Sequence, residues 1–150
     1  MPETSGGLPE NLVAVDAGAH IVHSGFKGMQ IAASALTAEA LKLAVPAAVF
    51  SRSTESHNQD KVSLGTIAAR DALRSLELAE TVAAILLLAG CQALDLRGAT
   101  AARGRARALH DAVRKEVPML RADRRQDVDI ARVLAALRAG ALPLGPLDRV

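Results

Sequence analysis

The 150-residue sequence contains almost no aromatic side chains: there is no tryptophan or tyrosine, and Phe26 and Phe50 are the only phenylalanines. Half of the residues are nevertheless hydrophobic, so a core must be built from alanine, leucine, valine and isoleucine. Alanine and leucine favour helices, and this length suits one globular domain. The composition therefore predicts an all-α protein, and the missing tyrosine excludes a phenol of this chain as a general base.

Cysteine is almost as scarce. The single Cys91 cannot form an intrachain disulfide, which excludes a disulfide-stapled secreted module and favours a cytoplasmic protein. The polar start, Met1 to Gly7, lacks the basic and apolar regions of a signal peptide. The longest uninterrupted apolar run, Val82 to Cys91, is about half as long as a membrane-spanning helix requires, so we expect it in a protein core and no membrane partner.

Charge is unevenly distributed, although the net charge is only +2. Between Arg97 and Arg138, basic residues outnumber acidic residues by eleven to five. A basic surface can bind nucleic acid, but this chain has almost no rings on which bases could stack. The interleaved acids instead favour a solvated or intersubunit helix surface.

Periodicity divides the chain into an irregular segment and a helical domain. Residues 1–23 carry glycines and a proline without a helical pattern, so we expect them to be irregular. Residues 24–150 are expected to form one domain, with a polar loop at 46–62. Its predicted helices lie at about 24–45, 63–96, 100–117 and 127–139.

The second predicted helix is unusually long and uneven in polarity. About 34 residues extend roughly 50 Å as a helix, more than an ordinary small globule needs. The stretch Val82 to Cys91 is apolar on every side and must be surrounded. Because a chain of this size offers few other helices, we expect a second chain to cover part of this surface and the protein to be oligomeric.

The loop at 46–62 concentrates side chains that could hold an amino acid by its charged ends. Two carboxylates, an imidazole and two amides lie within six positions, at Glu55, His57, Asn58, Gln59 and Asp60. The alternative interpretation is structural: Asp60 or Ser63 would cap the second helix, and the loop would bind nothing.

Other candidate sites have less support. His20 and His23 have a spacing seen among metal ligands on helices, but their segment lacks a helical pattern and no further pair accompanies them. We therefore predict no metal site. Cys91 lies inside the apolar run, where a thiol normally behaves as an inert small hydrophobe.

Three segments occur in an order that resembles a known family. They are His23 to Gly28, which contains Gly-Phe-Lys-Gly, Ser53 to Arg70, and Cys91 to Arg97. Together they resemble the superfamily of aromatic amino-acid (phenylalanine, tyrosine and histidine) ammonia-lyases and aminomutases. The resemblance extends over roughly residues 8–134 and corresponds to the C-terminal portion, less than a third, of a full-length enzyme. It implies long helices that contribute to the central bundle of a tetramer-like oligomer.

The resemblance also implies a cofactor and pocket residues. Family members cyclise an Ala-Ser-Gly tripeptide into methylidene-imidazolone (MIO) and use a tyrosine as the base, whereas this chain has neither. The MIO and the tyrosine are therefore expected from a larger partner chain, and this chain alone is expected to be inactive. By resemblance, Glu55 lies near the amino group of an aromatic substrate, and Asn58 and Gln59 lie near the MIO. Lys27 lies across the cavity from Glu55, and its neighbour Phe26 is a second substrate-facing candidate.

The order of residues in the loop distinguishes branches of the family. Glu55 precedes the Asn-Gln pair, and this order together with Lys27 favours the phenylalanine type. In the histidine type a glutamate follows the pair, where this chain has Asp60. Ser56 and Lys61 depart from the residues common in the family, which leaves the aromatic substrate open.

The ends of the chain add one expectation. Met1 opens the sequence and residues 143–150 close it much as the family closes. We therefore expect the small subunit of a split ammonia-lyase or aminomutase. The alternative is a noncatalytic helical scaffold or regulatory subunit derived from the lyase fold.

Overall fold

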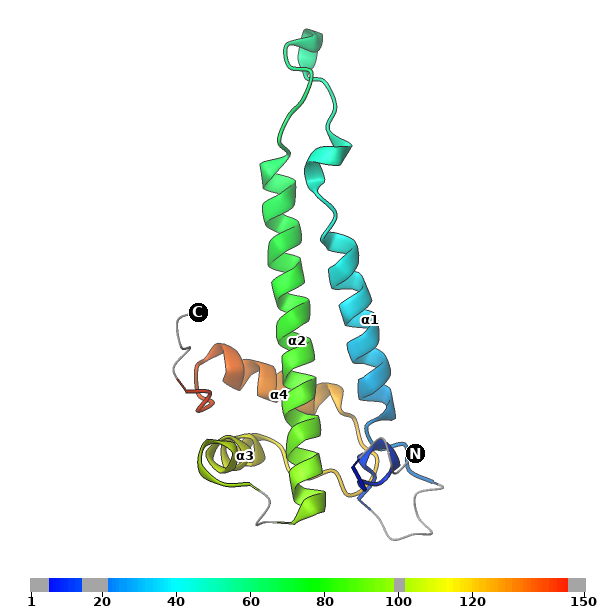
Figure 1. Ribbon diagram of the computed structural model, residues 1–150, viewed down its shortest axis with the longest axis vertical. Coiled ribbons are helices and arrows are strands. Elements are labelled where there is room, and N and C mark those ends of the chain that lie inside the picture. Colours follow the sequence, from blue (N-terminus) through cyan, green and yellow to red (C-terminus); the bar gives the residue numbers. More distant parts are fainter. Residues whose placement is uncertain (1–5, 15–21, 99–101, 146–150) are drawn as a thin grey trace.

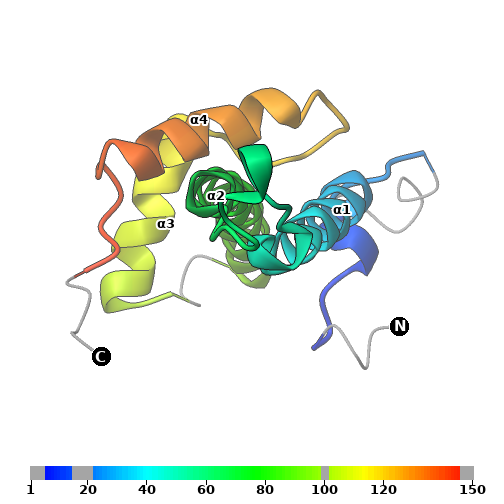
Figure 2. The ribbon, with the colours of Figure 1, turned by 90° about the horizontal axis from the view of Figure 1, so that it is seen from above.

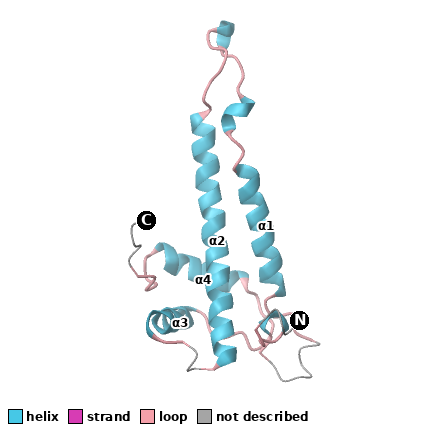
Figure 3. Ribbon diagram, viewed as in Figure 1, coloured by secondary structure: helices cyan, strands magenta, loops and turns pink. Residues whose placement is uncertain are grey.

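The computed structural model of the chain describes residues 6–14, 22–98 and 102–145. These residues form four α-helices, which are α1 (Lys27–Leu43), α2 (Gly65–Arg97), α3 (Gly104–Glu116) and α4 (Asp127–Arg138). Short 3-10 turns are η1 (Glu10–Leu12), η3 (Ala47–Phe50) and η4 (Glu55–His57). No strand occurs within these described ranges, which confirms the all-α fold (Figure 3).

The helices form a long hairpin with a crosspiece at one end. α1 and α2 run antiparallel and side by side, and α3 and α4 lie across the C-terminal half of α2 (Figures 1 and 2). The predicted helix at 24–45 extends up to three residues beyond the ends of α1. The predicted helix at 100–117 begins at residues 100 and 101, which lie outside the described ranges, and otherwise extends up to two residues beyond α3. The irregular segment predicted at 1–23 contains η1, while residues 1–5 and 15–21 lie outside the described ranges.

α2 is built differently along its length. It contains 33 residues and ends at Arg97, directly before Gly98, whose φ of 96° suits glycine, as the sequence predicts. None of its first thirteen residues, up to Glu77, is buried, and its buried residues begin at Leu78. By length and composition alone α2 could cross a membrane, a test that the core helix of a globular protein also passes. Between Ala84 and Gln92 the buried side chains of α2 lie in the core, where α1, α3 and α4 pack on this helix.

The hydrophobic core lies where α2 meets the other helices. Its buried members come from every helix and from the segments that follow α3 and α4, and include Phe26, Met29, Ile85, Leu88, Val113, Val117, Leu120, Val133 and Leu142. Burial of branched aliphatic chains at this junction is the main stabilising contribution to the fold. The end of the hairpin distant from α3 and α4 has no comparable cluster in the described residues.

The single chain leaves part of α2 uncovered. Leu86, in the middle of the apolar run, is 65% exposed. An apolar groove of about 570 Å³ lies beside it between α2, α3 and Leu144, and a second of about 540 Å³ lies between α1 and α2. The sequence predicts that a second chain covers part of the apolar surface of α2. The exposed apolar surfaces agree with this expectation, and the second chain itself stays a prediction.

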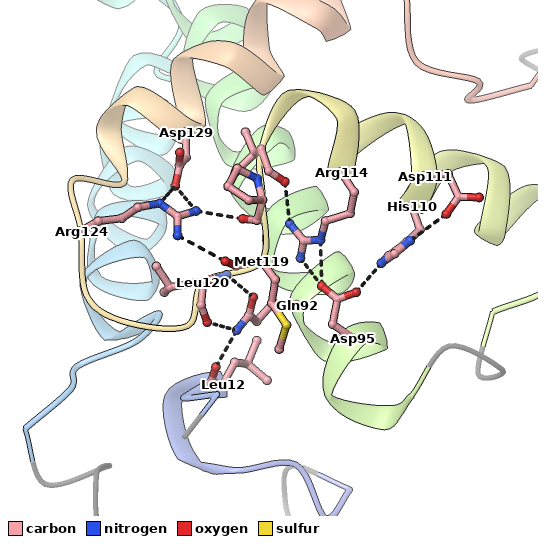
Figure 4. Close-up of polar contacts among 12 residues, drawn as sticks. Leu12, Gln92, Asp95, His110, Asp111, Arg114, Met119, Leu120, Arg124 and Asp129 are labelled. Carbon is pink, nitrogen blue, oxygen red and sulfur yellow. Dashed lines mark hydrogen bonds and ion pairs between the residues drawn. The ribbon is translucent and has the colours of Figure 1, made fainter. Parts of the chain in front are cut away.

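Ion pairs account for much of the arginine excess near the C-terminus. Five of these arginines pair with carboxylates: Arg107 with Asp111, Arg114 with Asp95, Arg124 with Asp129, Arg125 with Asp127 and Arg138 with Glu80. Two of these pairs join different helices: Arg114 of α3 with Asp95 of α2, which is drawn in Figure 4, and Arg138 of α4 with Glu80 of α2. Asp95 of α2, for example, also lies 2.6 Å from His110 Nε2 of α3. The charge pattern therefore serves packing between helices, in keeping with the interpretation as a helix surface.

Candidate functional site

The polar loop predicted as a site lies at the far tip of the hairpin (Figure 1). We call residues 44–64, which join α1 to α2, the apical loop. Its tip is closed by two hydrogen bonds between the same residues: Thr54 N donates to the Gln59 carbonyl and Gln59 N donates to Thr54 Oγ1, both at 3.0 Å. Further down, Val62 N donates to Oγ of the buried Ser51 at 2.7 Å. These hydrogen bonds join residues that are near one another in sequence and hold the shape of the loop, while η3 at its base contacts α2.

The closed tip holds three predicted site residues together. Glu55 begins η4, and Asn58 N donates to its carbonyl at 2.9 Å. Ser56 and His57, between them, have left-handed φ values of 52° and 57°, which turn the chain sharply. The side chains of Glu55, Asn58 and Gln59 are exposed and make no hydrogen bond within the described part of the chain. One carboxylate and two amides therefore remain available to a ligand.

The alternative interpretation, in which the loop caps α2, is wrong for the residues that it names. The N-cap of α2 is Leu64, in a left-handed conformation with φ 53°, and no side chain caps the helix. Asp60 and Ser63 are exposed and bond to none of the first amides of α2. The polar composition of the loop is therefore not explained by capping.

Lys27 and Phe26 lie at the other end of the hairpin. α1 begins at Lys27, and its 17 residues extend about 25 Å before the apical loop begins. Lys27 is exposed, whereas Phe26 is 8% exposed and packs in the core. A single chain therefore does not bring Lys27 opposite Glu55. Phe26 packs with Met29 and residues of α2 in the core, away from the apical loop.

The other candidates read from the sequence find no ligand-binding geometry. His20 lies outside the described residues, and His23 Nδ1 lies 3.9 Å from Asp123. The described residues contain no group of three or more histidine, cysteine and acidic side chains arranged for a metal. Cys91 is buried, and burial raises the pKa of its thiol, which disfavours the nucleophilic thiolate.

Several polar residues with clear roles were not predicted. Gln92 is fully buried and bonds to the backbone of Leu12 and Leu120, and Asp95 joins His110 and Arg114 (Figure 4). Gln92 lies four residues after Leu88 on α2 and therefore on the same core-facing side of the helix. This spacing could have predicted its burial from the sequence.

Comparisons with known proteins identify the family. Residues 1–115 match the family described as aromatic amino acid lyase. The tyrosine ammonia-lyase of Cupriavidus metallidurans is 42% identical over 142 residues, which are 94% of this chain and 26% of that protein. The MIO-dependent tyrosine 2,3-aminomutase of Streptomyces globisporus is 42% identical over 135 residues, 89% of this chain and 24% of that protein. Among solved structures, histidine ammonia-lyase from Trypanosoma cruzi superposes with a TM-score of 0.85 at 34% identity, over 95% of this chain and 27% of that one.

The chain belongs to the aromatic amino acid lyase family, the superfamily of aromatic ammonia-lyases and aminomutases that its motifs resemble. It spans about a quarter of the length of the curated relatives that it matches. The closer assignment to the phenylalanine type stays a prediction.

Proposed function

We propose that this chain is the small subunit of an MIO-dependent ammonia-lyase or aminomutase, and that it lines the pocket for an aromatic L-amino acid. A larger chain would supply the MIO and the tyrosine. The observation that carries the proposal is the closed tip of the apical loop, which presents Glu55, Asn58 and Gln59 together with unpaired side chains. Binding and catalytic residues lie disproportionately on loops that a rigid scaffold positions, and the two long helices supply such a scaffold here.

Glu55 and Lys27 have the charges needed to bind an amino acid at both ends. The Glu55 carboxylate would accept hydrogen bonds from the substrate ammonium and could take a proton from it. Lys27 carries the complementary charge for the substrate carboxylate. Because α1 separates these two residues by about 25 Å, the Lys27 and Glu55 that share a pocket would belong to different copies of the chain.

The amides of the apical loop suit the prosthetic group. MIO supplies an electrophile for the elimination of ammonia. Asn58 and Gln59 each carry two N–H donors that are unpaired in the described structure, and such donors would stabilise negative charge on an imidazolone. These two residues would therefore hold the group, while the fixed loop would spare the cost of reorganising them during the reaction.

Assembly of several copies would cover the exposed apolar surface. The grooves on both sides of α2 and the 65% exposure of Leu86 support an oligomer of helices packed along α2. The same surface would serve the alternative function, a noncatalytic helical scaffold. Variants of the apical loop distinguish the two, because only the enzyme subunit uses those side chains chemically.

The test is complementation. The tyrosine ammonia-lyase of Cupriavidus metallidurans, with the matching quarter of its chain deleted, is mixed with this chain. We expect co-elution in size-exclusion chromatography and release of an arylacrylic acid from tyrosine or phenylalanine, which neither protein achieves alone. The variants are Gln59→Ala, Asn58→Ala and Glu55→Gln, with Arg132→Ala and Glu116→Gln as exposed controls.

The outcomes separate the proposals. Turnover about a hundredfold lower in Gln59→Ala at unchanged MIO content supports the pocket role, because one preorganised donor contributes on that order. Assembly without turnover, or turnover that none of the loop variants changes, would favour the scaffold. Failure of the two chains to associate would refute the small-subunit proposal.

A further inference from the structure

The backbone turn that precedes Lys27 is held by residues nearly one hundred positions away in the sequence. We call residues 24–27 the Lys27 turn, and residues 117–126, which join α3 to α4, the connector. We propose that Asp123, assisted by Gln126, is a positioning residue that fixes Lys27 through this turn. The inference rests on the proposed function of Lys27, and its structural part depends only on the hydrogen bonds described next.

The Asp123 carboxylate accepts from two successive amides of the turn. Ser24 N donates to Oδ2 at 2.7 Å and Gly25 N donates to Oδ1 at 3.0 Å, so both oxygens are used. Gln126 completes the contact from the same connector, since its Nε2 donates to the Gly25 carbonyl at 3.0 Å. The connector therefore satisfies two donors and one acceptor in three successive peptide units of the turn, and this fixes the orientation of the turn as well as its position.

The N-terminal segment holds the turn from another side. Phe26 N donates to the Asn11 carbonyl at 2.8 Å, and the Phe26 ring is anchored in the core. Gly25 has φ +52°, and a Cβ at this position would lie 2.5 Å from the Asn11 oxygen. The chain thus passes through a space that only glycine fits, and Lys27 follows two residues later as the first residue of α1.

The charge of Asp123 suits the place where it binds. α1 has no capping side chain, and Asp123 binds the two amides that directly precede its N-cap Phe26, near the end of the helix where the dipole favours negative charge. The hydrogen bond from Ser24 N is the main cause that lowers the pKa of Asp123, which keeps the carboxylate ionised at neutral pH.

We call the hydrogen bonds of Asp123 and Gln126 to the Lys27 turn the clamp. The first experiment tests the clamp without measuring any enzyme activity. Amide hydrogen exchange is measured by NMR on the full chain and on its Asp123→Asn variant. The control is Asp111→Asn, which neutralises a similarly exposed carboxylate on α3 that does not contact the turn. We expect exchange at Ser24 and Gly25 to become about tenfold faster in Asp123→Asn, because the stronger charged acceptor is lost, and to stay unchanged in the control. Unchanged exchange at both amides would overturn the proposal.

The second experiment tests whether the clamp acts through Lys27. In the complemented enzyme, kcat/KM is measured for Asp123→Asn, Lys27→Met and the double variant, with Lys42→Met as a control on the same helix. We expect Asp123→Asn to lower kcat/KM about tenfold when Lys27 is present, since small misplacements of a substrate-binding group are costly, and to change it little in Lys27→Met. Losses that simply multiply would assign Asp123 a purely structural role and overturn the proposal.

The two experiments also separate this inference from the function on which it rests. Faster exchange in Asp123→Asn together with full activity of Lys27→Met would leave the clamp in place, but would remove Lys27 from the pocket and overturn its positioning role. Slow exchange in Asp123→Asn together with an inactive Lys27→Met would keep the proposed function and refute the clamp.

Discussion

Replacing Gln92 by leucine should destabilise the protein far more than removal of a typical polar side chain. Gln92 is 0% exposed, and its Nε2 donates to the carbonyls of Leu12 and Leu120 at 3.1 and 2.8 Å. Its Oε1 accepts from Leu120 N at 3.0 Å. The one side chain therefore ties α2 to both the N-terminal segment and the connector (Figure 4).

The expected loss follows from the groups that Gln92→Leu leaves unpaired. Leucine has a similar volume, so the packing is largely kept, but the N–H and the carbonyl of the buried Leu120 lose their partner. Each buried polar group without a partner costs about 1–3 kcal/mol. The carbonyl of the half-buried Leu12 adds less, because water can reach it. We expect a loss of about 3 kcal/mol, a large part of the roughly 5–15 kcal/mol that stabilises a typical domain.

Urea unfolding followed by far-ultraviolet circular dichroism measures this loss. Several protein concentrations are needed, because assembly adds to the apparent stability. Arg132→Leu is the control: Arg132 is exposed on α4, and its replacement should change the free energy of unfolding by about 0.5 kcal/mol or less. A loss below about 1 kcal/mol in Gln92→Leu would show that the hydrogen bonds of Leu120 are replaced easily and would refute the reasoning.

Three further predictions concern the turn, the apical loop and the exposed face. Gly25→Ala places a Cβ 2.5 Å from a backbone oxygen at φ +52° and should lower the free energy of unfolding by about 2 kcal/mol or more. Gly28→Ala lies in open space on α1 and should raise the free energy of unfolding by about 0.5–1 kcal/mol. Thermal unfolding that gave both changes the same sign would contradict this. Thr54→Val removes the acceptor for Gln59 N and should lower turnover of the complemented enzyme, while Thr54→Ser should restore it; equal activities would count against the loop geometry. Leu86→Asp, at a 65% exposed position, should leave the helix content intact and abolish assembly in sedimentation velocity, and an oligomer that persisted would exclude this face as the interface.

The ends of the helices show how far local sequence signals reach. Gly98 predicts the end of α2 because its φ of 96° is open to glycine and costly for other residues. The start of the same helix was not predictable, since the left-handed residue there is Leu64 and no local preference marks a leucine for that conformation. Asp60 and Ser63, which precede the helix, are residue types that commonly cap helices, but neither caps α2.

The candidate site was predictable in composition and not in arrangement. The polar loop places Glu55, Asn58 and Gln59 close together because they are neighbours in sequence. The distance between Lys27 and these loop residues follows from the length of α1, a helix that the periodicity predicted. A resemblance to pocket residues, in contrast, does not say how many chains form the pocket. The contact of Asp123 with Gly25 joins residues 98 positions apart, and no periodic pattern encodes such a pair.

α2 also acts as a lever. The distance from Leu88, in the core, to Gly65, where the apical loop joins the helix, is about 35 Å at the rise of an α-helix. A tilt of about two degrees at the core therefore moves the tip by about 1 Å, a displacement that can cost about a hundredfold in rate at a catalytic site. Substitutions among core residues that change the tilt slightly would be felt most strongly at the opposite end of the molecule, in residues that they never touch. Contacts between a neighbouring chain and the apical loop would reduce this displacement of the tip.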